Sequence, residues 1–546
     1  MGERKQNGAG SKALRFLGFD STFRSSLPTM IHYNWAVFLG NGSFYIIGLF
    51  LIPFLTRVEG LSAAQAGLVV LCAKLCDAVT DPVMGILTDR TRSRFGRHRP
   101  YLLLGLVPAA LTYFLLWNSY ALPQADSTRK MAYFIAIYML FSTAYTVVMV
   151  PHTAMLPALA PSYDLRTQFN AMRTVIDAVG TEGSFLIATL LLSYRTIPGK
   201  SVLGNTLQAL GNTPEFDHTF RGKFMLMGLI LCLFFTLPLL MTFFGTKEES
   251  SLKMQPPPFS LREVFDEYRS ILRNRAFRQY FALSFFNTVS LGFVSNSSYY
   301  FLQSVAGMVG LYTITNLISQ AGEVAGFPLN YLLSIRFSKQ TPAKIELPFI
   351  LLSLGLSFFV HDGSGRWIMI LLTIFYNFGI AGASGVTSNL FPDVTDVDEM
   401  LCGERREGKI STFSTLIRKI VSGLSAAMTG FVLHAFGFDA SAQTHSAVSL
   451  FGVRFTYAVL PMIFMTCSII SAYRYRMTKE DHALIRRALR EKHETGETTL
   501  DLAEQARCAA VSGVPWEEMW IGKPAVCVPE PMQDTKKHPC KNVDNE

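Results

Sequence analysis

Charged residues are scarce in this chain of 546 residues, because Asp, Glu, Lys and Arg together make up 16% of it. Soluble proteins carry about a quarter, so the composition argues against a soluble protein. The sequence also lacks a GxxxxGK[ST] phosphate loop, a GxSxG elbow and an HExxH pair. ATP-driven pumping and hydrolysis therefore have no recognisable site, and we expect the protein not to be an enzyme.

Cysteine is rare as well, with eight residues scattered along the chain. Cys72 and Cys76 are one helical turn apart, and such a pair inside an apolar segment is more typical of packing than of a metal site. No zinc spacing or disulfide framework is present, so we expect no cofactor. Residues 1–30 contain no apolar run before a cleavage site, and no signal peptide is expected.

Apolar residues, by contrast, make up 50% of the chain, and 43 of them are Phe. They form blocks such as 102–117 and 224–244, which are close to the roughly 20 residues that a helix needs to cross a bilayer. The sequence therefore predicts an all-α integral membrane protein that crosses the membrane many times.

Twelve such spans are expected, in two sets of six. Their predicted ranges are 31–56, 64–88, 100–121, 130–157, 168–194, 223–245, 278–304, 308–335, 343–361, 367–391, 410–436 and 450–474. The predicted organisation is an N-terminal segment (1–30), an N-terminal six-helix bundle (31–245), a polar linker (246–277), a C-terminal six-helix bundle (278–474) and a tail (475–546).

Basic residues collect in the connections on one side of these spans, which predicts that this side is cytoplasmic. The loop after the second span holds five Arg and His98. Both termini, the linker and the tail would then lie in the cytoplasm of a plasma or inner membrane protein. The net charge of +9 is explained by this asymmetry and by contact with anionic lipid, so we expect no nucleic-acid partner.

The second span and its loop read "DAVTDPVMGILTDRTRSRFGRHRP" (77–100). Asp77 and Asp81 are four residues apart and so share one face of a helix. An ionised Asp in mid-membrane costs about 2.5–3.5 kcal/mol or more, which is tolerated if the face binds a cation. Neutralisation of Lys74 and other buried bases is the alternative.

The eighth span aligns weakly with the second. When Pro82 is set over Pro328, Asp77 falls over Glu323 and the basic loops coincide. Such a parallel repeat is typical of two six-helix bundles related by an axis along the membrane normal.

The loop pattern GxxxDRxxxRxGRxRP resembles that of the major facilitator superfamily, and the longer string from Asp77 to Pro100 resembles its glycoside–pentoside–hexuronide:cation symporters, typified by melibiose permease. Residues 391–419, "FPDVTDVDEMLCGERREGKISTFSTLIRK", resemble the loop of that family before span 11. The resemblance covers about residues 31–490. It implies the twelve-helix major facilitator fold and cation-coupled symport by alternating access.

The resemblance also implies a cation site. The positions that match the coupling-cation ligands of the family are Asp77, Thr80, Asp81 and Thr146, with Thr80 where Asn is frequent. All four offer oxygen, so Na⁺, H⁺ or Li⁺ would suit them. If sodium is the coupling ion, Asp77 and Asp81 are the expected metal ligands.

The expected solute site departs from melibiose permease. Asn41 and Met149 stand where that protein holds its sugar with two aspartates, and Thr153 replaces a stacking aromatic residue. The matching bases, Arg173 and Lys419, are retained. Losing acids while keeping bases favours an anionic or zwitterionic solute, such as a hexuronide or a lysophospholipid-like molecule. A neutral glycoside and a non-transporting receptor on the same fold are the alternatives.

Charged residues at the helix ends are expected to form gates that break during transport. The predicted gating residues are Lys74, Asp89, Arg90, Arg94, Arg97, Asp177, Glu323, Arg405 and Arg406. Internal ion pairing of Arg173, Asp177 and Lys419 would be an alternative to solute binding. The expected partners are a small-molecule solute, the coupling cation and membrane lipid, and the protein is expected to be a monomer.

Overall fold

The computed structural model describes most of the chain, and the described parts are helical without any β-strand. The described residues are 21–118, 126–160, 163–193, 221–248, 266, 268–337, 341–440, 442, 444–475 and 477–523, apart from some side chains within these ranges.

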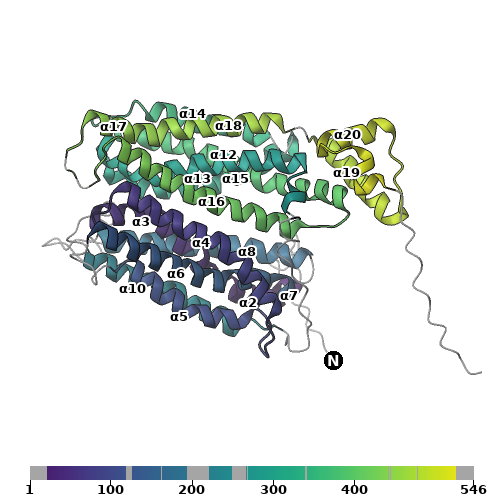
Figure 1. The fold of residues 1–546 in the computed structure, drawn as a ribbon, viewed down its shortest axis with the longest axis horizontal. Helices are drawn as coiled ribbons and strands as arrows, with labels where there is room; N and C mark the ends of the chain where they lie inside the picture. Colours follow the sequence, from purple (N-terminus) through teal and green to yellow (C-terminus); the bar gives the residue numbers. More distant parts are fainter. Residues whose placement is uncertain are drawn as a thin grey trace, which may run out of the picture.

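The N-terminal half forms a bundle of six long helical segments, drawn in purple to blue in Figure 1. Its elements are α2 (Ser21–Asn34), η1 (Phe38–Gly42), α3 (Ser43–Pro53), η2 (Phe54–Val58), α4 (Ala63–Arg90), α5 (Arg99–Leu116), α6 (Ser127–Ala154), α7 (Leu156–Leu159), α8 (Tyr163–Ser193) and α10 (Arg221–Gly245). The first four follow one another as a single crossing segment, and α7 continues α6.

The C-terminal half forms a second bundle beside the first, in teal to green (Figure 1). Its elements are α12 (Arg275–Tyr300), η4 (Phe301–Val305), η5 (Val309–Leu311), α13 (Tyr312–Arg336), α14 (Thr341–Ser357), α15 (Arg366–Cys402), α16 (Glu407–Ala435), α17 (Ala447–Arg454), η6 (Phe455–Val459) and α18 (Leu460–Arg474). Within the described ranges, 9 helices are long and apolar enough to cross a membrane. The segments α12, α13 and α14 fall short of that test and complete the twelve.

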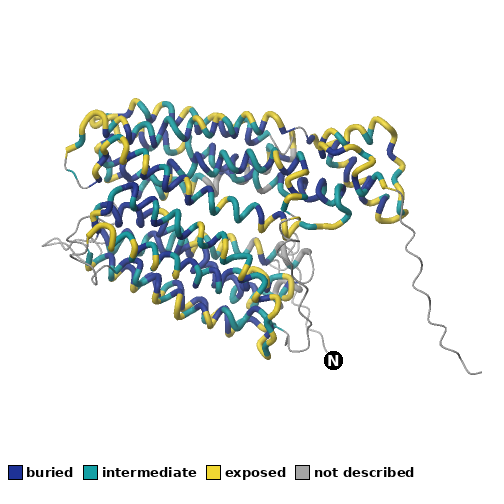
Figure 2. Tube along the Cα trace, viewed as in Figure 1, coloured by how far each residue is buried: buried dark blue, intermediate teal, exposed yellow. Residues whose placement is uncertain are grey.

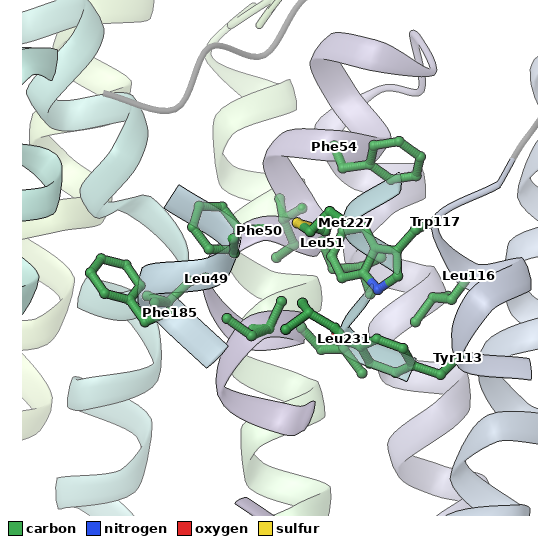
Figure 3. Close-up of a cluster of buried hydrophobic side chains, with 14 of the residues drawn as sticks. Leu49, Phe50, Leu51, Phe54, Tyr113, Leu116, Trp117, Phe185, Met227 and Leu231 are labelled. Atoms are coloured by element: carbon green, nitrogen blue, oxygen red, sulfur yellow. The ribbon is translucent and has the colours of Figure 1, made fainter. Parts of the chain in front are cut away.

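Large apolar and aromatic side chains fill the interior of the N-terminal bundle (Figure 3). Phe54 packs against Trp117 with ring centroids 5.5 Å apart, and Trp117 stacks on Phe224 at 6.1 Å. In a bilayer the lipid is as apolar as the core, so close packing rather than escape from water holds such helices together.

The outer faces of the helices are apolar too, which suits a protein surrounded by lipid. On α5, Leu104, Val107 and Leu111 are exposed and recur at helical spacing, and α10 exposes Leu229, Leu233 and Leu237 in the same way. Exposed positions follow the outside of both bundles in Figure 2.

The bundles meet chiefly where α4 packs along α16. A Cβ atom on Gly67 would lie 2.8 Å from the carbonyl oxygen of Ala426, so only glycine permits this approach. Hydrogen bonds also join the halves; among them, the hydroxyls of Thr56 and Tyr300 are 2.7 Å apart, and Tyr312 donates to the Leu49 carbonyl at 3.3 Å. These contacts lie away from the end that carries loop 91–98, which we call the arginine-loop end.

Beyond the bundles, the described part of the tail forms the helices α19 (Lys479–Thr495) and α20 (Leu502–Ser512), followed by the short turns η7 (Trp516–Glu518) and η8 (Trp520–Gly522). They stand at one end of the C-terminal bundle, in yellow in Figure 1. Their buried side chains Ile485, Leu489 and Met519 share a core with Val397 and Met400 of α15. The tail up to residue 523 is therefore a packed part of the C-terminal bundle.

Several predicted boundaries differ in the structure. The first helix begins at Ser21, ten residues before the predicted span, and α15 continues to Cys402, so the segment 391–402 that resembles a loop is helical. Most of the predicted linker (246–277) and residues 194–220 lie outside the described residues.

Candidate functional site

The acid pair of α4 lies where the two bundles meet, with α4 packed against both α6 and α16. Asp77 and Asp81 are one helical turn apart, so their carboxylates face the same side. The side chain of Asp77 is completely buried, and that of Asp81 is 17% exposed. Buried carboxylates need opposite charge and hydrogen bonds around them, and neighbouring helices supply both.

Lys419 supplies positive charge from the other bundle. Its Nζ lies 2.5 Å from Asp81 Oδ2 and 3.9 Å from Asp77 Oδ2. We expected this lysine to meet the solute, but here it pairs with the proposed coupling acids, which is the internal ion pairing left open by the sequence. The pair joins α4 to α16 and therefore couples the two bundles.

Lys74 supplies a second positive charge. Its Nζ lies 3.7 Å from Asp77 Oδ2 and 3.8 Å from the centre of the Phe44 ring, a distance at which a cation is attracted by an aromatic face. From the sequence, Lys74 was the base expected near the two acids Asp77 and Asp81. The structure adds Lys419, so the described charges of the cluster balance.

Hydroxyl groups of α6 complete the cluster. Thr146 Oγ1 donates to Asp81 Oδ1 at 2.8 Å, and Ser142 Oγ donates to Asp77 Oδ1. Thr80 instead bonds weakly to the Asp77 backbone carbonyl of its own helix at 3.5 Å. Ser142 was not among the predicted residues, although its position one turn before Thr146 on the same helix face could have indicated it.

The predicted solute residues fall into two groups. Asn41 is exposed and its Nδ2 donates to Asp177 Oδ2 at 2.5 Å, while Arg173 lies one turn before Asp177 on α8. Met149, in contrast, is buried at 6% exposure, and the Thr153 hydroxyl donates to the Val150 carbonyl of its own helix at 2.9 Å. The structure thus brings Asn41, Arg173 and Asp177 together.

In loop 91–98, predicted gating residues pair only loosely. Arg97 and Asp89 are 3.8 Å apart with half-exposed side chains, and Arg94 lies over the Phe95 ring at 4.8 Å. Arg90 also makes a contact. Exposed pairs of this kind contribute about 0–1 kcal/mol each.

A tighter contact follows this loop and was not predicted. Glu248 accepts a hydrogen bond from the His98 backbone N–H at 3.0 Å, and its Oε1 lies 2.5 Å from His98 Nδ1. Burial alone would raise the pKa of Glu248, but the hydrogen bonds from His98 and the Arg99 backbone N–H outweigh it and lower this pKa.

The second motif is held by a buried ion pair. Arg406 donates two hydrogen bonds of 2.9 Å to the carboxylate of Asp398, and both side chains are at most 9% exposed. Arg405 is 61% exposed and lies 4.0 Å from Glu399 and 3.5 Å from Glu407. Of the two arginines of this motif that were predicted to gate, Arg406 is therefore the one in a strong geometry.

Tail histidines lie against three acids of this motif. His482 Nε2 lies 3.0 Å from Asp396 and 3.3 Å from Asp393, and His493 Nε2 lies 3.0 Å from Glu399. The sequence did not indicate these contacts, because the partners are distant in the chain. The side chain of Glu323, another predicted gating residue, lies outside the described residues.

Opposite the arginine-loop end, Glu59 forms a further cluster that was not predicted. Its buried carboxylate lies 3.3 Å from Arg221 Nε and 3.8 Å from Lys130 Nζ, and Lys130 also donates to the Glu59 carbonyl at 2.9 Å. The cluster ties the ends of η2, α6 and α10 together.

A cavity of about 260 Å³ lies in the C-terminal bundle, and α3 closes one side of it. No charged side chain lines it within the described chain; its polar lining includes Tyr45, Tyr312, Asn316, Tyr376, Asn377 and Tyr457. Asn377 Nδ2 donates to Ser319 Oγ at 3.0 Å. Small polar residues within α12 and α13, such as Ser295, Ser298 and Asn316, contribute to this lining.

Comparison with known proteins places this geometry in a wider context. The model of a family described as MFS/sugar transport protein matches residues 36–479. The putative glycoside/cation symporter YagG of Escherichia coli is 27% identical, covering 83% of this chain and 93% of its own. The sodium-dependent lysophosphatidylcholine symporter 1-A of Danio rerio is 23% identical, covering 81% of this chain and 85% of its own.

Solved structures show a similar architecture. A bacterial homologue of the human lysosomal transporter Spinster superposes with a TM-score of 0.58 at 14% identity, covering 83% of this chain and 98% of that protein. At this identity the likeness concerns the fold. The cluster of acids, lysines and hydroxyls between α4, α6 and α16 lies within the residues matched by the family model.

Proposed function

Because the chain belongs to the MFS/sugar transport protein family, we propose that it is a cation-coupled symporter for an anionic or zwitterionic solute. It has the major facilitator fold and is a multi-pass membrane transporter, not an enzyme. We place the arginine-loop end in the cytoplasm of a plasma or inner membrane, since basic loops stay on that side.

The ion pair between Lys419 and Asp81 carries the proposal. An ammonium group and a coupling cation compete for the same carboxylate oxygen, so binding of Na⁺ or H⁺ at Asp81 displaces Lys419 Nζ from its position 2.5 Å away. Asp77, Ser142 and Thr146 then offer further oxygens, of the kind that Na⁺ prefers. The coupling ion in this scheme is a cargo and not a resident cofactor.

Displacement of Lys419 links the cation to the solute. The side chain is only 21% exposed, and a buried cation without a partner is unfavourable. A carboxylate or phosphate of the solute would restore the pairing, so cation binding strengthens solute binding. By linkage, the solute strengthens cation binding by the same factor.

The remainder of the solute site is proposed around Asn41, Arg173 and Asp177. The carboxylate of Asp177 accepts a hydrogen bond from Asn41 at 2.5 Å, and Arg173 follows the same helix. A positive and a negative group one turn apart suit a zwitterion, and Arg173 suits a carboxylate or phosphate. A lysophospholipid-like or hexuronide-like solute agrees with both features.

A neutral glycoside is the second candidate, and the uncharged cavity favours it. Tyrosines and asparagines line this space of about 260 Å³, and such side chains bind sugar hydroxyls without selecting for charge. Similarity to a putative glycoside/cation symporter supports the same possibility.

Alternating access would use the contacts between and within the bundles. The pair of Lys419 and Asp81 joins the bundles, and the contacts of Glu59 and Arg406 fix the opposite ends of the helices. One charge that crosses a potential of 100 mV supplies about 2.3 kcal/mol, which is enough to drive accumulation of the solute.

A titration of the purified protein with Na⁺, at constant ionic strength in choline chloride and at several pH values, tests the coupling step. We expect the cation to raise the Tm of the wild type, Lys419→Ala to bind it about tenfold more tightly because the competitor is gone, and Asp81→Asn to lose the effect. Arg418→Ala is the matched control, since its guanidinium bonds Thr415 and not the acids. Equal cation affinity in wild type and Lys419→Ala would contradict the competition.

A further inference from the structure

The C-terminal bundle buries an acid that the coupling scheme does not use. Glu346 lies on the second turn of α14, and its exposure is 1%. Neither carboxylate oxygen has a hydrogen-bond partner of good geometry among the described residues, although the Asn330 amide is close enough to interact with the carboxylate. An ionised carboxylate in this position would be unstable, so the group must hold either a proton or a cation.

Small and polar residues of the neighbouring helices surround the side chain of Glu346. A Cβ atom on Gly382 of α15 would lie 2.5 Å from Glu346 Oε2, so any larger residue there would displace the carboxyl group. On the other side stands Asn330 of α13, whose Nδ2 donates to the Ala381 carbonyl at 3.3 Å. Asn389 donates to Asn330 Oδ1 at 3.3 Å and thereby fixes the amide.

Charged groups on the helices around Glu346 are engaged elsewhere or exposed in the described structure. Lys344 lies over the Tyr473 ring at 5.3 Å, Asp393 pairs with His482, and Arg336 is exposed at the end of α13. No described lysine, arginine or histidine forms an ion pair with the carboxylate. Charge compensation by a side chain is therefore not available in the described surroundings.

A metal cation fits the site poorly. Sodium and calcium prefer several oxygen ligands, but the neighbouring oxygens of Asn330 and Ala381 already accept hydrogen bonds. A proton needs only one carboxylate oxygen, and the resulting O–H can turn toward the Asn330 amide. The donor set therefore favours a proton.

We propose that Glu346 is a proton-binding site in the C-terminal bundle, separate from the cluster of Asp77 and Asp81, and that its protonated form stabilises the packing of α13, α14 and α15. The folded protein then holds a proton that the unfolded chain releases above about pH 4.3. Stability must consequently fall as the pH rises, because the folded state binds more protons than the unfolded state.

The test compares thermal unfolding of the purified wild type and Glu346→Gln from about pH 5 to about pH 9. Glutamine has the shape and neutrality of the protonated acid, so we expect the Tm of the wild type to fall with rising pH and that of the variant to fall much less. Glu59→Gln is the matched control, because it removes a buried carboxylate that has Arg221 and Lys130 as partners. It should lower the Tm throughout this range.

A second measurement needs no variant. A hydrophobic carbodiimide modifies carboxyl groups that carry a proton in apolar surroundings, and peptide mass spectrometry locates the product. We expect modification of Glu346 and protection of Glu59 in the wild type. Parallel pH profiles of wild type and Glu346→Gln, or an unmodified Glu346, would overturn the proposal. Neither measurement involves solute or coupling cation, so the outcome is independent of the proposed transport function.

Discussion

The two bundles keep their charges in different places. The N-terminal bundle holds Asp77, Asp81 and Lys74 midway along α4, where Lys419 reaches the two acids from the other half. The described C-terminal bundle instead pairs its charges at one end, through Asp398 with Arg406 and the tail histidines, and keeps an uncharged cavity along its helices. The charges that we propose to exchange with a cargo thus lie within one bundle, and the ion pairs of the second motif lie at the end of the other.

The largest effect is expected for Asp81→Asn, which removes a charge from the cluster of Asp77, Asp81 and the two lysines without changing the shape of the side chain. We expect complete loss of cation-driven accumulation, with normal insertion in the membrane, and the same for Asp77→Asn. Solute uptake into vesicles under a cation gradient measures this accumulation. Glu517→Gln, an equal change of charge at an exposed site of the tail, should transport normally. Full accumulation by both aspartate variants would refute the assignment of the site.

The next largest effect concerns the fixed charges. Arg406→Ala leaves the buried carboxylate of Asp398 without its partner, and breaking such a pair costs about 3–5 kcal/mol. We expect a large drop in the Tm of the purified protein. Arg405→Ala, at 61% exposure, should cost less than about 1 kcal/mol. Equal effects of the two substitutions on the Tm would show that the pair of Arg406 and Asp398 does not stabilise the protein more than an exposed pair does.

Which bundle recognises the solute can be decided by paired substitutions. If the solute is anionic, Lys419→Ala should weaken its binding about tenfold, or 1.4 kcal/mol, while Tyr376→Phe in the cavity changes it little. Direct binding of a glucuronide, a lysophospholipid and a neutral disaccharide provides the measurement. Tight binding of the disaccharide, weakened by Tyr376→Phe and indifferent to Lys419→Ala, would instead favour the uncharged cavity.

The smallest expected effect lies at the arginine-loop end of the N-terminal bundle. The lowered pKa of Glu248 means that its contribution to stability is present above about pH 4.3 and is lost as the pH falls through the folded-state value. Glu248→Gln should therefore lose less Tm on acidification than the wild type. Glu518→Gln, at 58% exposure, should follow the wild-type curve. If the Tm of Glu248→Gln fell on acidification as much as that of the wild type, the result would argue against a stabilising contact between Glu248 and His98.

Much of the candidate site could be predicted from local pattern. The four-residue spacing of Asp77 and Asp81 places them on one helix face whatever surrounds the helix, and Thr146 does meet Asp81. Thr80 does not, because its hydroxyl is nearest a carbonyl of its own helix. Such a preference depends on rotamer and packing, which spacing alone does not define.

The segment 391–402 shows where local pattern misleads. Pro392 and the acids that follow it resemble a loop, yet α15 continues to Cys402. The acids remain helical because Arg406 neutralises Asp398, and His482 and His493 of the tail face Asp396 and Glu399. Those partners become neighbours only when the tail packs on the bundle.

The sequence by itself determined the apolar spans, their grouping into two halves and the acids of α4, because each depends on composition and spacing over a few helical turns. Only the tertiary structure decided the partners of those acids. Lys419 is 338 residues from Asp81 in the chain and reaches it because Gly67 lets α4 approach α16. Ion pairs over such separations depend on helix packing, and packing is a property of all the helices together.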